Sequence, residues 1–314
     1  MPFFEYLRVS ITDRCNLRCV YCMPEEGIPK LGHDQVLRYE EILTIVKAAM
    51  EEGVFRIRVT GGEPLVRKGV SSFLTEVARV PGLRDLALTT NGMLLKEMAS
   101  SLKIAGLMRV NVSLDSLQPE RFAKLTRGGD LMKVLEGIRV ATEQGLHPVK
   151  VNCVLLPGEN DGEILDFAQF AYSNPVQIRF IERMPFRGTG AETLFVNQEE
   201  IRHRISERFV LEPTDQKKGG GPAELFSLKG GKGQIGFISS RSNPFCHKCT
   251  RLRLTAAGVL MPCLDQQKGI QVRGKSIEEI REIIRNLGKE KQAAGKGCPT
   301  FQQAGCISLS DIGG

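Results

Sequence analysis

The sequence predicts an α/β fold in which parallel strands alternate with helices over about the first 184 residues. Three observations carry this prediction. Short strand-like runs recur along the chain, helix-period runs lie between them, and glycine-rich or polar motifs follow the carboxyl ends of several strands. Such alternation is typical of βαβ units. Six strands of this kind could form an open sheet or an incomplete barrel.

The strand predictions rest on short apolar runs, the first of which alternates Leu7, Val9 and Ile11 with polar residues. The helix predictions rest on apolar residues three or four positions apart, as in the run that ends at Gly53. The predicted strands are residues 7–12, 55–60, 85–90, 109–114, 149–155 and 176–181, and the predicted helices between them are residues 39–53, 131–145 and 161–173.

The pattern changes after residue 186, so we divide the chain into residues 1–186 and residues 187–314. The second region lacks the regular alternation of strand and helix. It is expected to contain a helix, a glycine-rich loop with a short strand pair, a hairpin and a charged helix, at residues 197–209, 217–236, 251–264 and 276–294, respectively.

Composition limits the classes of function. The chain has 314 residues, 41% of them hydrophobic, and no run near the roughly 18 apolar residues of a membrane span. Its first residues lack the pattern of a secretory signal, so a cytoplasmic protein with no membrane association is expected. The formal charge of +7 suits an anionic partner. The basic residues are scattered and tryptophan is absent, so nucleic acid is not expected as a partner.

Cys15, Cys19 and Cys22 follow the first predicted strand and are the most specific local motif. Thiolates select soft metal centres such as zinc or iron–sulfur clusters. Four-iron clusters normally take four cysteines, so three local cysteines would leave one iron open to a non-protein ligand. A zinc site is the alternative, but no fourth Cys or His lies nearby in the sequence.

Cys246, Cys249 and Cys263 form a second group of three. Zinc is a rival here, because His247 could serve as a fourth ligand, although its position beside Cys246 makes that geometry awkward. Beside the first motif, a second cluster with its own open iron is the preferred interpretation. The other three cysteines are Cys153, Cys298 and Cys306, and the last two have no assigned role.

The CxxxCxxC spacing resembles the radical S-adenosylmethionine (SAM) superfamily. With the second cysteine group, the run CxxC-x-R-x-R-x-T and the terminal Gly313 and Gly314, the chain resembles the MoaA family. The resemblance implies an incomplete (β/α)6 radical SAM barrel with a C-terminal extension that carries a second iron–sulfur cluster. The two regions would then be the barrel and an extension that contains the GTP site and the Gly-Gly tail.

The resemblance also implies the activity. Family members are GTP 3′,8-cyclases of molybdenum cofactor biosynthesis, which convert GTP to (8S)-3′,8-cyclo-7,8-dihydroguanosine 5′-triphosphate. The cofactors implied are two 4Fe–4S clusters and SAM, whose cleavage gives an adenosyl radical that removes the ribose 3′ hydrogen. The partners implied are a flavodoxin- or ferredoxin-like electron donor and a downstream, MoaC-like cyclic pyranopterin monophosphate synthase. A homodimer is compatible with the family.

By position, the resemblance assigns each site residue. The first cluster would be held by Cys15, Cys19 and Cys22, and the second by Cys246, Cys249 and Cys263. The first three cysteines, Arg251 and Arg253 are the catalytic assignments. The SAM contacts would be Tyr21, Gly62, Ser113 and Met184, and the GTP contacts would be Arg8, Arg58, Thr89, Lys150, Arg251 and Arg253.

Two details depart from the family pattern. Thr250 stands where asparagine is frequent, and residues 297–300 do not match the usual approach to the tail. Residues 269–276 satisfy the pattern of a phosphate-binding P-loop, but the preceding residues are polar. Ser276 and Glu279 are better explained as a capping box that opens the last helix.

Two alternatives remain at this point. Within enzymes, another two-cluster radical SAM protein could modify a peptide or RNA. From another class, the chain could be a non-catalytic electron carrier or a zinc-stabilised binding module.

Overall fold

The computed structural model describes residues 2–184, 195–214, 221–246, 249–263 and 269–293. The strands are β1 (Tyr6–Ser10), β2 (Arg56–Thr60), β3 (Asp85–Thr90), β4 (Arg109–Ser113), β5 (Val149–Leu155), β6 (Val176–Glu182), β7 (Leu211–Pro213), β8 (Glu224–Leu228), β9 (Gln234–Ile238), β10 (Arg251–Leu254), β11 (Val259–Met261) and β12 (Ile270–Gln271). The helices are α1 (Tyr39–Glu51), α2 (Val70–Ala78), α3 (Leu95–Ile104), α4 (Pro119–Thr126), α5 (Leu131–Glu143), α6 (Ile164–Ser173), α7 (Gln198–Ser206) and α8 (Ile277–Ala293), with short 3-10 turns at Pro64–Val66 and Asp161–Glu163.

All of these strands belong to one curved sheet, in the order β12-β11-β10-β1-β2-β3-β4-β5-β6-β9-β8-β7. The six predicted strands are β1 to β6, and they are parallel, as the sequence predicted. The sheet continues beyond them, because β10 pairs in parallel with β1 and β9 pairs in parallel with β6. The later part of the chain therefore extends both edges of the sheet formed by the earlier part.

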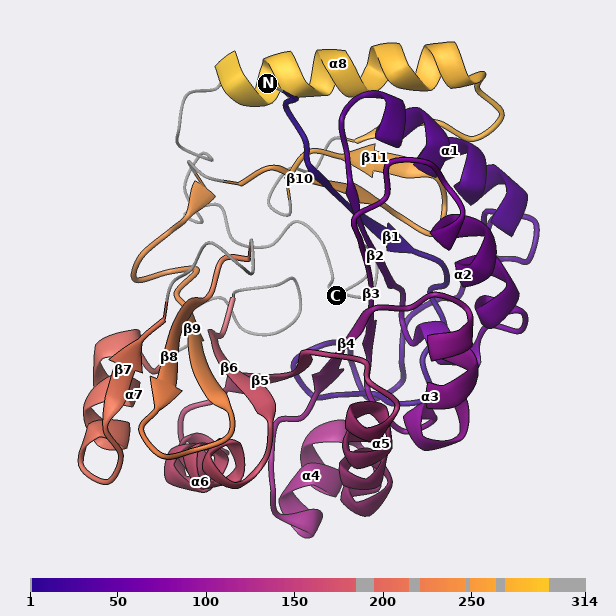
Figure 1. Ribbon diagram of the computed structural model, residues 1–314. Helices are drawn as coiled ribbons and strands as arrows, with labels where there is room; N and C mark the ends of the chain where they lie inside the picture. The colour runs from indigo at the N-terminus through magenta and orange to yellow at the C-terminus, as the bar shows by residue number, and fades with distance from the viewer. Residues whose placement is uncertain (1, 185–194, 215–220, 247–248, 264–268, 294–314) are drawn as a thin grey trace.

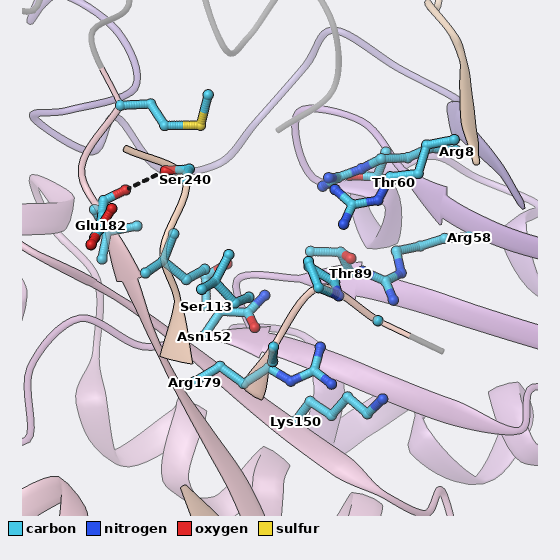
Figure 2. A pocket seen from close by; sticks show the side chains of 18 of the residues that line it. Arg8, Arg58, Thr60, Thr89, Ser113, Lys150, Asn152, Arg179, Glu182 and Ser240 are labelled. Carbon is cyan, nitrogen blue, oxygen red and sulfur yellow. Dashed lines mark hydrogen bonds between the residues drawn. The ribbon is translucent and has the colours of Figure 1, made fainter. Parts of the chain in front are cut away.

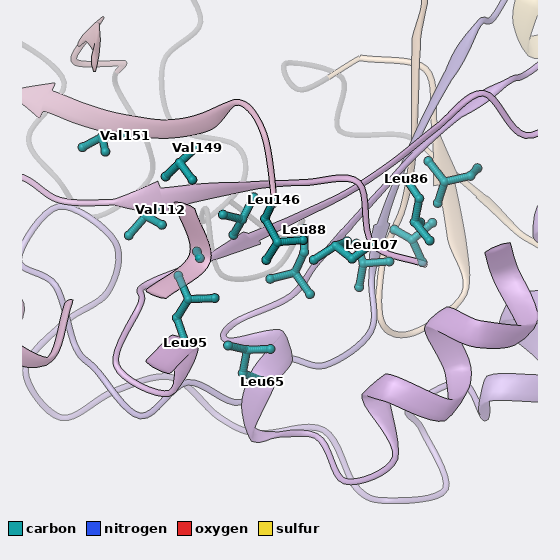
Figure 3. Packing of buried hydrophobic residues seen from close by; sticks show 14 of the residues in the cluster. Leu65, Leu86, Leu88, Leu95, Leu107, Val112, Leu146, Val149 and Val151 are labelled. Carbon is teal, nitrogen blue, oxygen red and sulfur yellow. The ribbon is translucent and has the colours of Figure 1, made fainter. Parts of the chain in front are cut away.

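Helices cover the outer side of the sheet, and Figure 1 shows α1 to α6 following its curve. Between the two layers lies a core of leucine, valine and isoleucine side chains from alternate strand positions. Leu88 from β3, Val112 from β4 and Leu95 from α3 are each fully buried in it (Figure 3). Since side chains alternate across a strand, the intervening positions face the opposite, inner side of the sheet.

The helix ends agree with the local sequence signals. Gly53 follows α1 with a φ of +95°, a conformation that glycine adopts without a Cβ penalty. At the start of α8, Ser276 N donates to Glu279 Oε2 (2.8 Å) and Glu279 N donates to Ser276 Oγ (3.3 Å). The capping-box interpretation is therefore confirmed for this segment.

Other expectations were only partly correct. The predicted helix at residues 161–173 begins with a 3-10 turn, and α6 starts at Ile164. The predicted hairpin is the antiparallel pair β10 and β11, and the glycine-rich stretch contributes the antiparallel pair β8 and β9.

In the parts of the chain that the structure describes, no helix is long and apolar enough to cross a membrane.

Replacing Leu88 by alanine tests the core. The side chain is fully buried, so we expect Leu88→Ala to lower the free energy of unfolding by about 2–5 kcal/mol, through lost burial and the cavity left behind. The matched control is Ile104→Ala on α3, where the side chain is 83% exposed and a change within about 0.5 kcal/mol is expected. Urea denaturation followed by circular dichroism measures both. Equal destabilisation in the two variants would contradict this account of the core.

Candidate active site

A cavity of about 880 Å3 lies on the inner face of the sheet, and Figure 2 shows part of its wall. Pockets of this size are typical of small-molecule and cofactor sites. Every residue that the sequence assigned to the two cysteine groups, to SAM or to GTP lines this cavity. The structure thus brings together residues that lie up to 255 positions apart, from Arg8 to Cys263, while their individual roles stay predictions.

The first cysteine group lies on the loop that follows β1. Its backbone is tied to the end of α4, since Arg18 N donates to Thr126 O (3.1 Å) and Val20 N donates to Leu125 O (2.9 Å). The guanidinium of Arg127 donates to Arg18 O (3.1 Å) and to Met23 O (3.0 Å). The segment that carries Cys19 and Cys22 is therefore held at both ends by one side chain.

The three thiols share an environment that opposes their ionisation. Burial raises the pKa of Cys22 to about 12, with further contributions from Cys15 and Asp115. The pKa of Cys19 is raised well above its ordinary value, first by burial and then by the charges of Asp115 and its two neighbouring thiolates. Thiolates that disfavour one another in this way are stabilised when a positive metal centre binds between them.

No group of three Cys, His, Asp or Glu side chains within the described ranges is arranged to hold a single metal ion. Cys15, Cys19 and Cys22 are nevertheless thiols of one cavity wall, and no local fourth ligand accompanies them in the sequence. This donor set fits a multi-iron cluster, whose own width separates its ligands, better than it fits one zinc ion.

The Gly61-Gly62-Glu63-Pro64 segment after β2 packs against the cysteine loop. Gly62 N donates to Thr12 O (2.6 Å), and Glu63 N donates to Arg14 O (2.7 Å). A Cβ at Gly62 would lie 2.3 Å from Arg14 O, so only glycine permits this approach. Gly62 was assigned to SAM by resemblance, and the structure shows that the neighbouring backbone by itself requires a glycine here.

Two buried carboxylates support the loops, and neither of them was assigned a role from the sequence. Glu63 accepts hydrogen bonds from Leu65 N, Thr90 Oγ1 and Asn91 N. Asp115, at the end of β4, accepts a 2.6 Å hydrogen bond from the hydroxyl of Tyr21 and a 2.8 Å bond from Val154 N. Both residues follow strand ends, which was the only signal available in the sequence.

Cationic side chains line the wall of the cavity along the sheet. Register places Arg8 beside Arg253 on one side and beside Arg58 on the other, and all three share the inner face. Lys150 and Arg179 continue this face on β5 and β6 (Figure 2). Arg179 and Arg109 also line the cavity but were missed in the sequence, although their alternate positions on predicted strands would have indicated the inner face.

These cations are crowded and poorly hydrated. Burial, together with the neighbouring charges of Arg179 and Arg109, lowers the pKa of Lys150 to about 6. Burial likewise lowers the pKa of Arg8 to about 9 and that of Arg58 to about 10. The guanidinium groups still carry their charge at neutral pH, so the wall strongly favours an anionic ligand.

Several polar atoms on this wall lack hydrogen-bond partners within the described part of the chain. They are Thr89 Oγ1, Arg58 Nε, Arg253 Nη1 and Asn152 Oδ1, and each is buried. Buried polar groups are normally satisfied. A polar ligand in the cavity would provide the missing partners.

The second cysteine group lies before β10 and after β11. Cys249 N donates to Cys246 O (3.1 Å), so these two cysteines are linked directly through their backbones. Burial would raise the pKa of Cys249, but the charges of Lys291 and Arg251 outweigh it, and the pKa lies below its ordinary value. His247, the suggested zinc ligand, lies outside the described residues, as do Cys298, Cys306, residues 297–300, Gly313 and Gly314.

Replacing Arg127 tests the anchoring of the first cysteine loop. Arg127→Ala removes a charged donor from two backbone carbonyls, so we expect opening of residues 18–23 to become about 10–100-fold more frequent. Hydrogen exchange of the peptide that contains Cys19 and Cys22 measures this change. The matched control is Arg139→Ala, which removes a surface arginine paired with exposed or half-buried glutamates on α5. Unchanged protection of the loop in Arg127→Ala would refute the anchoring role.

Comparison with known proteins places this geometry in a family. Residues 9–171 match the radical SAM superfamily, and residues 176–296 match the Molybdenum Cofactor Synthesis C family. Among solved structures, Streptococcus suis SuiB bound to its precursor peptide SuiA is similar with a TM-score of 0.66, at 14% identity over 90% of this chain and 65% of that chain. Native anSMEcpe with bound AdoMet is similar with a TM-score of 0.60, at 16% identity over 91% and 83% of the two chains. At these identities the likeness concerns the fold alone.

Curated relatives are much closer in sequence. The GTP 3′,8-cyclase of Moorella thermoacetica is 53% identical over 86% of this chain and 84% of its own length. The GTP 3′,8-cyclase of Alkaliphilus metalliredigens is 44% identical over 99% and 97% of the two chains. With the two family matches, these relatives show that the chain belongs to the GTP 3′,8-cyclase family of the radical SAM superfamily.

Proposed function

We propose that this protein converts GTP to (8S)-3′,8-cyclo-7,8-dihydroguanosine 5′-triphosphate in molybdenum cofactor biosynthesis. The observation that carries the proposal is a single cavity in which a three-cysteine loop and a wall of buried cations face the same space. The cysteine loop suits a metal centre, and the cations suit a triphosphate. Membership of the cyclase family supplies the identity of the substrate and of the reaction.

Cys15, Cys19 and Cys22 would hold a 4Fe–4S cluster that binds SAM. When bound, this pair supplies the one-electron chemistry that starts the radical reaction. Tyr21, Gly62, Ser113 and Met184 would contact SAM, since all four line the cavity near the carboxyl ends of the strands. The hydrogen bond from Tyr21 to Asp115 fixes the orientation of the Tyr21 ring before SAM arrives.

The cationic wall would bind the phosphates of GTP. Arginine offers planar, bidentate recognition of phosphate, and burial strengthens each contact because water does not screen it. The residues assigned to GTP by resemblance are Arg8, Arg58, Thr89, Lys150, Arg251 and Arg253. Their placement around one cavity supports the assignment and adds Arg179, which is buried beside Lys150.

Cys246, Cys249 and Cys263 would hold a second 4Fe–4S cluster, which would supply a binding site for the guanine base. The lowered pKa of Cys249 favours a thiolate, which is the form that ligates metal. With the base held at one end and the phosphates held by the cations, the ribose has little freedom to turn. Such positioning raises the rate of one reaction and excludes others.

We also propose that the two regions of the chain have different functions. Residues 1–186 would form the SAM-binding partial barrel, and residues 187–314 would bring the second cluster, part of the GTP site and the Gly-Gly tail. The pairing of β10 with β1 supports this division of labour, because it sets Arg253 beside Arg8 across the boundary. An electron donor of the flavodoxin or ferredoxin type and a MoaC-like enzyme that takes the product are the partners we propose.

Modification of a peptide or RNA is not favoured. The relatives that are 44–53% identical are cyclases, whereas the peptide-bound SuiB structure shares only the fold with this chain. A non-catalytic electron carrier would have no use for the row of buried cations that lines the cavity.

Anaerobic turnover tests the proposed reaction. With SAM, GTP and a reductant, we expect 5′-deoxyadenosine and the cyclic product of GTP to form together. In the variant Arg179→Met, kcat/KM for GTP should fall about 10–100-fold through the loss of a charged contact to phosphate. Arg79→Met, which changes an exposed arginine on the outer side, is the matched control. Absence of both products from protein that holds both clusters would overturn the proposed function.

The pH dependence of GTP binding tests Lys150. Its pKa is about 6 in the free protein, and a bound phosphate would raise it, so binding takes up a proton above pH 6. Affinity for GTP should therefore fall as pH rises from 6 to 8, by up to about tenfold per pH unit. Lys150→Arg, which stays charged, should lose this dependence, and Lys150→Met reports the titration of GTP itself. Calorimetry without SAM measures the affinity for GTP at each pH in the parent protein and in the two variants. The same dependence of affinity on pH in all three proteins would contradict the role of Lys150.

A further inference from the structure

One lysine of the C-terminal helix reaches the segments that carry the second cysteine group. The Nζ atom of Lys291, on the last turn of α8, donates to Pro262 O (2.8 Å) and to Arg251 O (3.0 Å). It also lies 3.7 Å from the Sγ of Cys249 as a donor. An ammonium has three N–H donors and no acceptor, so these contacts use its full capacity.

The two carbonyl acceptors of Lys291 lie close in the sequence to cysteines of the second group. Pro262 immediately precedes Cys263, and Arg251 follows Cys249 by two residues. Arg251 begins β10 and Pro262 follows β11, so the β10–β11 hairpin separates them in the chain. The ammonium of Lys291 nevertheless donates to both carbonyl oxygens. Lys291 therefore connects the segment of Cys249 to the segment of Cys263.

The helix that carries Lys291 is held in place independently. Arg281 Nε and Arg285 Nε donate to the two carboxylate oxygens of Glu52 at 2.8 and 2.9 Å, which joins α8 to the end of α1. Gly288 packs so closely on Phe3 that a Cβ would lie 2.4 Å from the ring. With α8 fixed by these contacts, the reach of Lys291 is set by the fold rather than by a mobile side chain.

An aromatic ring lies beside the ammonium of Lys291, which is half-buried. The Nζ of Lys291 lies 5.2 Å from the centre of the Phe4 ring, and Phe4 is only 1% exposed. A cation beside an aromatic face gains a favourable electrostatic contact with the ring. On the same turn, Lys289 is exposed and serves as a natural comparison.

We propose that Lys291 is a positioning residue of the second cluster, which holds its ligand segments together and donates a charged hydrogen bond to the sulfur of Cys249. This inference rests on the proposed function, because it assumes that Cys246, Cys249 and Cys263 carry a cluster. Hydrogen bonds to ligand sulfurs are among the factors that set the reduction potential of iron–sulfur clusters. A positive donor stabilises the reduced, more negative state, so Lys291 raises the potential and slows the loss of iron.

The experiment isolates the second cluster in the full-length chain. Cys15, Cys19 and Cys22 are replaced by alanine, which leaves only the second cysteine group as a cluster site. Lys291→Met removes the charge at similar side-chain length, Lys291→Arg retains it, and Lys289→Met is the matched control on the same helix. Each protein is reconstituted with iron and sulfide, and circular dichroism confirms that it is folded.

Two measurements follow. Iron loss to a chelator should be about 10–100-fold faster in Lys291→Met than in Lys289→Met, as is typical when a group that supports a metal ligand is removed. The second measurement is a redox titration followed by electron paramagnetic resonance. In Lys291→Met, the ratio of reduced to oxidised cluster at a fixed potential should be about tenfold lower than in Lys289→Met. This corresponds to a reduction potential lower by about 59 mV for a one-electron couple. Lys291→Arg should lie nearer to the parent in both measurements.

The outcomes separate the two levels of the proposal. If the parent holds a cluster and Lys291→Met equals Lys289→Met in both measurements, the role of Lys291 is refuted and the proposed function stands. If the parent holds no iron–sulfur cluster, the second cluster and the role of Lys291 both fail. A Lys291→Met protein that is folded but cannot be loaded, while Lys291→Arg can, supports the inference.

Discussion

The inner face of the sheet holds several buried cationic side chains close together. Much of the remaining structure serves to place and support these cations. Arg8, Arg58 and Arg253 stand in one row across three neighbouring strands. Within the described residues, Arg109 has a direct carboxylate partner in Asp85. Buried charge of one sign is costly in an empty site and becomes favourable when an anion enters. The cavity is therefore built for the complex rather than for the free protein.

This condition explains why the outer layer must be so regular. The same strands that present arginine inward present leucine, isoleucine and valine outward, where α1 to α6 cover them. The alternation of strand side chains links the two faces, since a slip of one residue would exchange a buried apolar row for a charged one. Apolar packing on the outer face thus fixes the register that assembles the cations on the inner face.

Much of this arrangement could be predicted from local sequence. Alternating apolar positions located the six central strands, and the cysteine loop and Gly61-Gly62 were found at strand ends because parallel strands direct their carboxyl ends to one rim. The short strands β7 and β12 were missed, since two or three residues give no periodic signal. Arg179 could have been found by its alternate position on a predicted strand.

Other features are invisible in the sequence for a physical reason. The contact between Lys291 and Cys249 joins residues 42 positions apart through the docking of α8. Nor could the sequence show that Gly62 is required by the backbone of Arg14, because that contact arises only when two loops meet. Long-range packing decides such details, and local patterns do not record it.

The pairing of β1 with β10 has a consequence for the synthesis of the protein. Tyr6 to Val9 leave the ribosome early, whereas their partners, Arg251 to Leu254, follow roughly 240 residues later. At the usual rates of translation this interval is on the order of ten to fifty seconds. During that time one edge of β1 has no strand beside it and is open to wrong pairing. The sheet therefore gains the second neighbour of β1 only after β10 has been synthesised.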